Sequence, residues 1–393
     1  MTALQLELVQ YDKKLENLKD ENDQLVQRWM KKMSTEAEYM NDVNLELQRA
    51  RRASLLSPNT DIQSIDGNFF SSSVNNPAVL SAGTRNSRVT WSAYPRSVKK
   101  RIDARSSELH TMDISNDGHI LATGGQEKTV NLYDSMTGEI VYRLKGCLSS
   151  VNHVKISSDN RLAIAGSSDT SIYTWDLARM KLKDTLSGHI GKVTRVAISK
   201  DSSRIVSCSQ DRTIKIWDVK KNVCTKTIFS SSSCTDMCPL DYNCNTIVAG
   251  HMDNSIRFWD TQSGNSIHEI PRLHRHTITS VSCSEDGRLL LTNSRDGTLN
   301  IIDTRTYLPT VTMSAKDYKP TANWGQAKLS PDERYVAAGS MDGNIFFWDL
   351  AKSGKSSTMV KLYSQSPVVG LCWHPNTTLF YSVDVKGSIT TME

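Results

Sequence analysis

The stretch from Val193 to Asp218, VTRVAISKDSSRIVSCSQDRTIKIWD, determines the fold of this chain. It contains three short runs with β-strand character. VTRVAIS and RIVSCS are rich in Val and Ile, and TIKIWD alternates apolar with polar residues. The segments KDSS and QDR between them carry the Asp and Ser residues that favour tight turns. With the Gly-His pair Gly188-His189 just upstream, this combination predicts one blade of a β-propeller.

One such unit cannot bury both of its faces, so it requires stacked copies of itself. A large residue followed by an acidic residue closes each copy: Tyr133-Asp134, Trp175-Asp176, Trp217-Asp218, Trp259-Asp260, Ile302-Asp303, Trp348-Asp349 and the degenerate Met392-Glu393. The acidic residues follow one another at steps of 42, 42, 42, 43, 46 and 44 residues, which matches the WD-repeat period of roughly 40–45 residues. A turn Asp also recurs six residues before the aromatic residue, as in Asp169/Trp175, Asp211/Trp217, Asp253/Trp259 and Asp342/Trp348. The sequence therefore predicts an all-β, seven-bladed WD-repeat propeller over residues 97–393.

The last blade needs an outer strand from elsewhere in the chain. Residue 393 falls on the third strand of blade seven, and a closed propeller leaves no exposed sheet edge only if another segment completes that blade. SVKKRIDA, Ser97 to Ala104, is the segment placed to supply this strand.

Charge and cysteine content exclude several classes of function. The chain has 47 basic and 42 acidic residues, of which 31 and 29 fall after residue 105, so bulk nucleic-acid binding by the propeller is not indicated. The eight cysteines are scattered, and the cluster Cys234, Cys238 and Cys244 lacks the further ligands of a zinc site. We expect reduced cysteines, no metal and no cofactor, as in a cytoplasmic protein. The N-terminus does not resemble a signal peptide, and no run of about 20 apolar residues would span a membrane.

Residues 1–50 are predicted to form a coiled-coil helix. They contain no Gly or Pro, and apolar residues repeat at alternating steps of four and three. The predicted interface consists of Leu4, Leu8, Tyr11, Leu15, Leu18, Asn22, Leu25 and Trp29. Asn22 occupies an a-type position, which favours a parallel dimer. The alternative is an amphipathic helix packed on the propeller.

Residues 51–96 are predicted to be a flexible linker. Nine Ser, five Asn and the prolines Pro58, Pro77 and Pro95 interrupt the apolar pattern, so the segment cannot bury enough apolar surface to offset the entropy of ordering. Phe69-Phe70 and the basic group around Arg51 are candidate partner motifs within it.

His189, Ser207, Asp211 and Trp217 have the spacing of the hydrogen-bonded tetrad of WD repeats. A His, an Asp and a Ser also constitute a hydrolase triad, but a catalytic Ser must face its substrate and an oxyanion site. Ser207 lies in mid-strand, so we interpret the set as structural, with no catalytic residue. His274, Thr292 and Asp296 repeat the arrangement in blade five, and this repetition favours a structural role over a catalytic one.

The order of coil, polar linker and C-terminal propeller resembles the autophagy-related protein 16 family. The residues that carry the resemblance are Glu21-Asn22 and LVQRWM (Leu25 to Met30), Ser187-Gly188-His189 with Gly191-Lys192-Val193, Arg204 to Ser207, Ser209 with Asp211-Arg212-Thr213, Ile256 to Asp260, Ser330 to Asp332 and Tyr335 to Ser340. The WD signatures are shared by many scaffolds, whereas their combination with LVQRWM is specific.

The resemblance implies a non-catalytic autophagy scaffold. Such a protein acts with the conjugate of autophagy-related proteins 12 and 5, and directs transfer of a ubiquitin-like protein onto phosphatidylethanolamine at the forming autophagosome membrane. It implies a cytoplasmic protein recruited to the pre-autophagosomal membrane, dimerised by its coil, whose propeller receives cargo or receptor proteins. Acidic residues after the RWM motif, here Glu36, Asp42 and Glu46, would contact a phosphoinositide-binding propeller protein.

Members of that family carry an amphipathic helix before the coil, which binds protein 5. This sequence begins near the end of the coil, so we expect a chain that pairs with a longer 16-like chain and lowers lipidation when in excess. A short isoform, a fragment and an incomplete gene model remain open. The alternatives from other classes are a signalling propeller like the heterotrimeric G-protein β subunit, disfavoured by the long linker and by Asn22, and a ubiquitin-ligase substrate receptor, for which no adaptor-binding box is visible.

Overall fold

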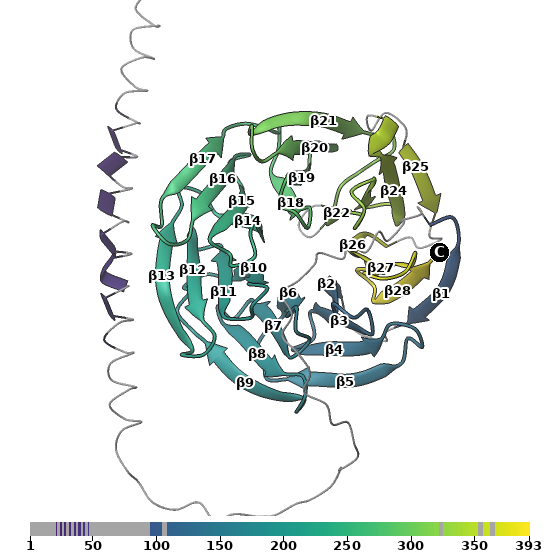
Figure 1. The fold of residues 1–393 in the computed structure, drawn as a ribbon, viewed down its shortest axis with the longest axis horizontal. Helices are drawn as coiled ribbons and strands as arrows, with labels where there is room; N and C mark the ends of the chain where they lie inside the picture. Colours follow the sequence, from purple (N-terminus) through teal and green to yellow (C-terminus); the bar gives the residue numbers. More distant parts are fainter. Residues whose placement is uncertain are drawn as a thin grey trace, which may run out of the picture.

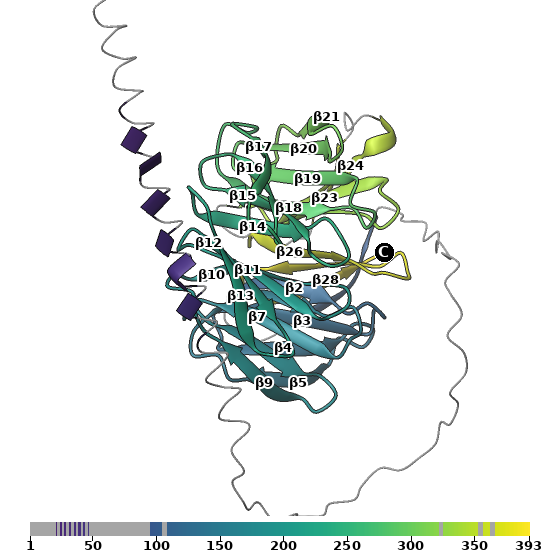
Figure 2. The same ribbon diagram turned by 60° about the vertical axis from the view of Figure 1, so that its left-hand side comes forward.

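The computed structural model describes residues 95–103, 108–321, 325–352, 357–361 and 366–393, together with helical positions scattered between residues 21 and 46. Seven four-stranded antiparallel sheets surround a central axis, and the first strand of each lies nearest that axis (Figures 1 and 2). This arrangement confirms the predicted seven-bladed propeller. Apart from residues 95 and 96, the predicted linker lies outside the described residues.

Within each blade, successive strands are neighbours in the sheet. Blade one comprises β2 (Leu109–Ile114), β3 (Ile120–Gly125), β4 (Thr129–Asp134) and β5 (Ile140–Lys145); blade two β6 (Val151–Ile156), β7 (Leu162–Ser167), β8 (Ile172–Asp176) and β9 (Lys181–Leu186); blade three β10 (Val193–Ile198), β11 (Arg204–Ser209), β12 (Thr213–Asp218) and β13 (Val223–Phe229); and blade four β14 (Cys234–Pro239), β15 (Thr246–His251), β16 (Ile256–Asp260) and β17 (Ser266–Ile270). Blade five comprises β18 (Ile278–Cys283), β19 (Leu289–Ser294), β20 (Thr298–Asp303) and β21 (Leu308–Ser314); and blade six β22 (Ala327–Leu329), β23 (Tyr335–Gly339), β24 (Asn344–Asp349) and β25 (Ser357–Lys361), with a short 3-10 helix η1 (Leu350–Lys352) before β25.

Blade seven joins the two ends of the propeller. Its strands are β26 (Val368–Trp373), β27 (Phe380–Asp384), β28 (Ser388–Met392) and, on the outside, β1 (Val98–Asp103). β1 pairs antiparallel with β28, and the backbone nitrogens of Arg96 and Ser97 donate to the carbonyl oxygen of Glu393 at 2.9 and 3.1 Å. The predicted closure by the SVKKRIDA segment is therefore confirmed.

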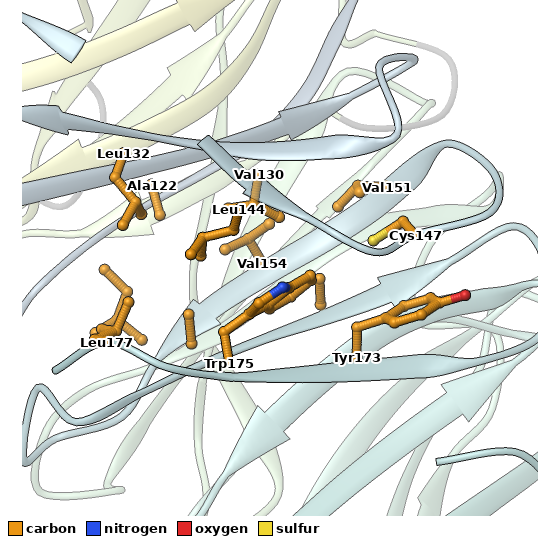
Figure 3. Close-up of a cluster of buried hydrophobic side chains, with 13 residues drawn as sticks. Ala122, Val130, Leu132, Leu144, Cys147, Val151, Val154, Tyr173, Trp175 and Leu177 are labelled. Atoms are coloured by element: carbon orange, nitrogen blue, oxygen red, sulfur yellow. The ribbon is translucent and has the colours of Figure 1, made fainter. Parts of the chain in front are cut away.

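The residue that closes each repeat packs against the preceding blade. Trp175 of blade two lies among Ala122, Val130, Leu132 and Leu144 of blade one (Figure 3). The other closing residues do the same: Trp217, Trp259, Ile302, Trp348, Met392 and Tyr133 join clusters with blades two, three, four, five, six and seven respectively. Fully burying one large apolar side chain stabilises a fold by about 1.5–3 kcal/mol. Seven such contacts connect the sheets into a continuous ring of cores.

A Ser-x-Asp turn connects the first two strands in most blades. In blade three the Ser199 hydroxyl donates to Asp201, and the same hydroxyl accepts the backbone N–H of Arg204 at 3.0 Å. The residue after the Asp adopts a left-handed backbone, with φ of +57° at Ser202 and +82° at Gly118. Because Asp and Ser side chains satisfy the turn's backbone groups, this short motif recurs between the first two strands of five blades.

Candidate functional site

The predicted tetrad of blade three is assembled by one continuous hydrogen-bond chain. Trp217 Nε1 donates to Ser207 Oγ at 2.8 Å, and Ser207 Oγ lies 2.8 Å from His189 Nε2. His189 Nδ1 lies 2.9 Å from Asp211 Oδ2. The strands β11 and β12 position Ser207 and Trp217, and the loops that precede β10 and β12 position His189 and Asp211. The structure thus brings all four residues together.

The donors in this chain follow from its chemistry. Since Trp217 can only donate, Ser207 uses its own hydrogen toward His189 Nε2, and His189 Nδ1–H donates to Asp211. Burial lowers the pKa of His189, which keeps the imidazole neutral. Burial alone would raise the pKa of Asp211, but hydrogen bonds from His189 and Thr213 outweigh burial and lower it strongly. The resting state is a neutral His beside a carboxylate.

This geometry does not suit nucleophilic catalysis. Ser207 is fully buried, at 0% exposure, and its oxygen already accepts the indole hydrogen of Trp217. A serine nucleophile needs access to a substrate carbonyl and an adjoining oxyanion site. The hydrogen bonds instead connect the loop before β10 to β11 and β12, so the tetrad holds the blade's strands and turns together.

Other blades carry reduced forms of the network. In blade five, His274 Nε2 lies 2.8 Å from Thr292 Oγ1 and His274 Nδ1 lies 3.4 Å from Asp296 Oδ2, while Ile302 replaces the Trp. In blade two, Asp169 accepts the Tyr173 hydroxyl at 2.9 Å in place of a His. Trp259 and Trp348 are buried with no partner for Nε1 among the described residues. The full four-residue chain is a feature of blade three within that part of the structure.

The predicted coil and acidic residues are described only in part. Leu25 is helical and 60% exposed, whereas Leu4, Leu8, Tyr11, Leu15, Leu18, Asn22 and Trp29 lie outside the described residues. Glu36, Asp42 and Glu46 are helical and exposed. At about 100° per residue, Asp42 and Glu46 share one face, while Glu36 points about 120° away from Asp42 and about 80° away from Glu46. Glu36 also lines a small hollow with Met40 and Ile190.

The described residues offer no cluster of three or more metal-ligating side chains. All eight cysteines are free thiols, and seven of them are buried. No helix in the described part of the chain is both long enough and apolar enough to cross a membrane.

Sequence reasoning missed a charged hollow at the propeller axis. It has a volume of about 480 Å³ and is lined by residues of blades one to five, including Arg195 and Lys192. Arg195 is 2% exposed and its Nε lies 2.9 Å from Asp236 Oδ1 of the neighbouring inner strand. The sequence signal that could have indicated this hollow is a charged residue within an otherwise apolar inner strand, such as Arg195 in VTRVAI.

The N-terminal part of the chain matches a family model. The model of autophagy protein 16 matches residues 1–41, a range that includes the LVQRWM motif. Autophagy-related protein 16 of Arabidopsis thaliana is 35% identical over 33% of this chain and 25% of its own length. The chain is thus similar to the autophagy protein 16 family. The predicted resemblance is therefore confirmed.

The propeller matches two further models. The WD domain, G-beta repeat model covers residues 97–134. The model of the nucleolar protein 10-like N-terminal domain covers residues 146–389, so the propeller also belongs to that family of β-propeller domains.

Longer relatives extend the comparison. Protein tipD of Dictyostelium discoideum is 35% identical over 100% of this chain and 65% of its own length. Protein Atg16l2 of Homo sapiens is 35% identical over 27% of this chain and 17% of its own length. The chain thus spans less than two thirds of the length of these relatives.

Proposed function

We propose that this protein is a non-catalytic scaffold of autophagy. The observation that carries the proposal is the autophagy protein 16 match at residues 1–41 on a chain that continues into a WD-repeat propeller. The polar network of blade three supports the absence of catalysis, because its groups bond to one another inside the blade. In this proposal the coil dimerises through Leu8, Leu15, Asn22 and their neighbours, and the propeller receives cargo or receptor proteins.

The finer part of the proposal concerns the membrane. Acting with the conjugate of autophagy-related proteins 12 and 5, the scaffold directs lipidation of a ubiquitin-like protein at the forming autophagosome membrane. A phosphoinositide-binding propeller protein recruits it there from the cytoplasm. The exposed carboxylates of Asp42 and Glu46 on one helix face support contact with a basic partner surface. Glu36 would contact the edge of that partner surface.

The first experiment tests dimerisation and partner binding in cells that lack their own 16-like protein. The chain is expressed with two different tags, and each tag is precipitated in turn. We expect recovery of the other tag, and loss of that recovery in the double variant Leu8→Lys, Leu15→Lys. Lipidation of the ubiquitin-like protein and co-precipitation of the 12–5 conjugate are scored in the same cells. No recovery of the conjugate, with or without a longer 16-like chain, would contradict the lipidation role.

A second experiment tests the acidic contact. Charge reversal at Asp42 and Glu46 to Lys should abolish co-localisation with phosphoinositide-rich membranes. Glu21→Lys is the matched control, because Glu21 is an exposed acidic residue of the same helical stretch that precedes the RWM motif. Equal loss in both variants would point to a general charge effect and contradict a contact at Asp42 and Glu46.

A further inference from the structure

Two cysteines face each other where blade four meets blade five. Cys238 lies near the end of β14 and Cys283 ends β18, and these inner strands are neighbours around the axis (Figure 1). Across this interface the backbone N–H of Val281 donates to the Asp236 carboxylate at 2.9 Å, and the Cys283 thiol donates to the carbonyl oxygen of Pro239 at 2.9 Å. Because side chains two residues apart share a face of a strand, this register places Cys238 opposite Cys283.

The pair is specific to this interface. The equivalent positions in the ring are the second-last residue of one inner strand and the last residue of the next. At the other interfaces between the described inner strands they are Asp113/Ile156, Lys155/Ile198, Ala197/Pro239, Ser282/Leu329, Lys328/Trp373 and Cys372/Ile114. Cys238 and Cys283 also belong to one cluster of side chains between blades four and five. A disulfide forms only where two Cβ atoms face each other across closely spaced backbones, and this interface is the one that offers two cysteines there.

The two thiols differ in accessibility and acidity. Of the eight cysteines, Cys283 is the one that is not buried. A hydrogen bond from Cys238 lowers the pKa of Cys283 although burial acts in the opposite direction, and the charges of Lys328 and Lys200 lower that pKa further. The same hydrogen bond, together with burial, holds the pKa of Cys238 well above its usual value. Because the thiolate is the nucleophile, Cys283 is the thiol that reacts first with an oxidant.

We propose that Cys283 and Cys238 form a reversible disulfide in response to hydrogen peroxide, joining the inner strands of blades four and five. The Cys283 thiolate attacks one peroxide oxygen, the O–O bond breaks, and the departing hydroxide takes up the thiol proton as water. The Cys238 sulfur then attacks the sulfenic acid of Cys283. The S–O bond breaks, and this second hydroxide leaves as water with the Cys238 proton. The two thiols lose two electrons, and one peroxide gains them.

The test uses the purified full chain, reduced and then freed of reductant. The native protein is treated with equimolar hydrogen peroxide, the remaining thiols are blocked with N-ethylmaleimide, and tryptic peptides are identified by mass spectrometry. We expect loss of two of the eight thiols and recovery of the Cys238 and Cys283 peptides as one disulfide-linked pair. Dithiothreitol should restore both thiols. Peroxide consumption without this linked pair, or pairing scattered over other cysteines, would overturn the proposal.

Variants separate the roles of the two thiols. Cys238→Ser should stop the reaction at the sulfenic acid of Cys283, which dimedone traps, and Cys283→Ser should leave the remaining thiols reduced. Cys372→Ser is the matched control, because Cys372 is a buried cysteine at the position equivalent to Cys238 and its loss should not affect the linked pair. If a Ser variant does not fold, the Ala variant at the same position decides the question.

Dimedone labelling of Cys238→Ser no greater than that of Cys283→Ser would contradict the assignment of Cys283 as the reacting thiol. Because no autophagy component is present in these experiments, their failure leaves the scaffold proposal standing.

Discussion

Replacing Asp211 with Ala tests whether the tetrad stabilises blade three. The change removes the carboxylate acceptor of the His189 Nδ1–H and leaves only the Thr213 hydroxyl, 3.1 Å from Nδ1, beside a fully buried side chain. A buried donor left unpaired costs about 1–3 kcal/mol. The hydroxyl and backbone N–H of Thr213 also lose Asp211, at 2.6 and 2.8 Å. Because Thr213 is half-buried and water can reach it, we add only about 1 kcal/mol for these bonds. The expected loss is about 2–4 kcal/mol.

The measurement is urea unfolding of the full chain followed by tryptophan fluorescence, with thermal unfolding as a second probe. Asp201→Ala is the control, because Asp201 forms the exposed Ser-x-Asp turn of the same blade. Asp211→Asn should recover part of the loss, since its amide oxygen still accepts from His189. Equal stability of the Ala variants at positions 211 and 201 would refute a structural role for the network. Loss of an esterase activity at unchanged stability would restore the catalytic interpretation.

Four further predictions follow from the same features. Asn22→Leu should raise helix stability in residues 1–50 and allow oligomers other than the dimer. Sedimentation measures the oligomeric state, and a monomer in both forms at high concentration would exclude the dimer. Deleting Ser97 to Ala104 should expose the edge of β28 and cause aggregation. A melting temperature equal to that of the intact chain would show that this strand does not stabilise the closed propeller. Thr170→Gly should raise the free energy of unfolding, measured in urea, by up to about 1 kcal/mol, because a β-branched residue at φ +74° is strained. Gly297 and Gly343 occupy the equivalent turns of other blades. Destabilisation would show that the Thr170 side chain contributes more than its strain costs. Burial lowers the pKa values of His189 and His274. Burial and the charge of Arg257 together lower the pKa of His251 to about 4. Stability should therefore be fully present above pH 6.5 and fall as the pH drops toward 4, by up to about 1.4 kcal/mol per pH unit for each His; a flat profile in urea unfolding would contradict this.

The blades were predictable because each repeat encodes the same local structure. The closing residue occupies one place in every blade, facing the blade before it, so even Ile302 and Met392 preserve the pattern by burial alone. The spacing of His189, Ser207, Asp211 and Trp217 reflects a network formed within one repeat, and one repeat is what a sequence pattern displays.

The hollow could not be predicted in the same way. Arg195, which lines the hollow, pairs with Asp236 about one repeat away along the chain. Lys155 and Asp113, on two other inner strands, form a pair with the same separation, and each partner alone looks like an unmatched charge. Ring closure brings them together, and the inner strands differ from blade to blade at these positions. For the acidic residues of the helix, counting residues after the RWM motif was not enough, because helical periodicity places Glu36 away from Asp42 and Glu46.

Closure by β1 has a mechanical consequence. β1 is hydrogen-bonded on one side only, to β28, and the polypeptide that precedes residue 95 leads directly into it. If the N-terminal segment is anchored to one body and the propeller to another, tension between them acts first on this strand. Such a load would detach its residues from β28 in succession, starting beside Met392, rather than shearing the whole pairing at once. The propeller would thus open at a defined seam, and blades one to six would yield only after that seam had parted.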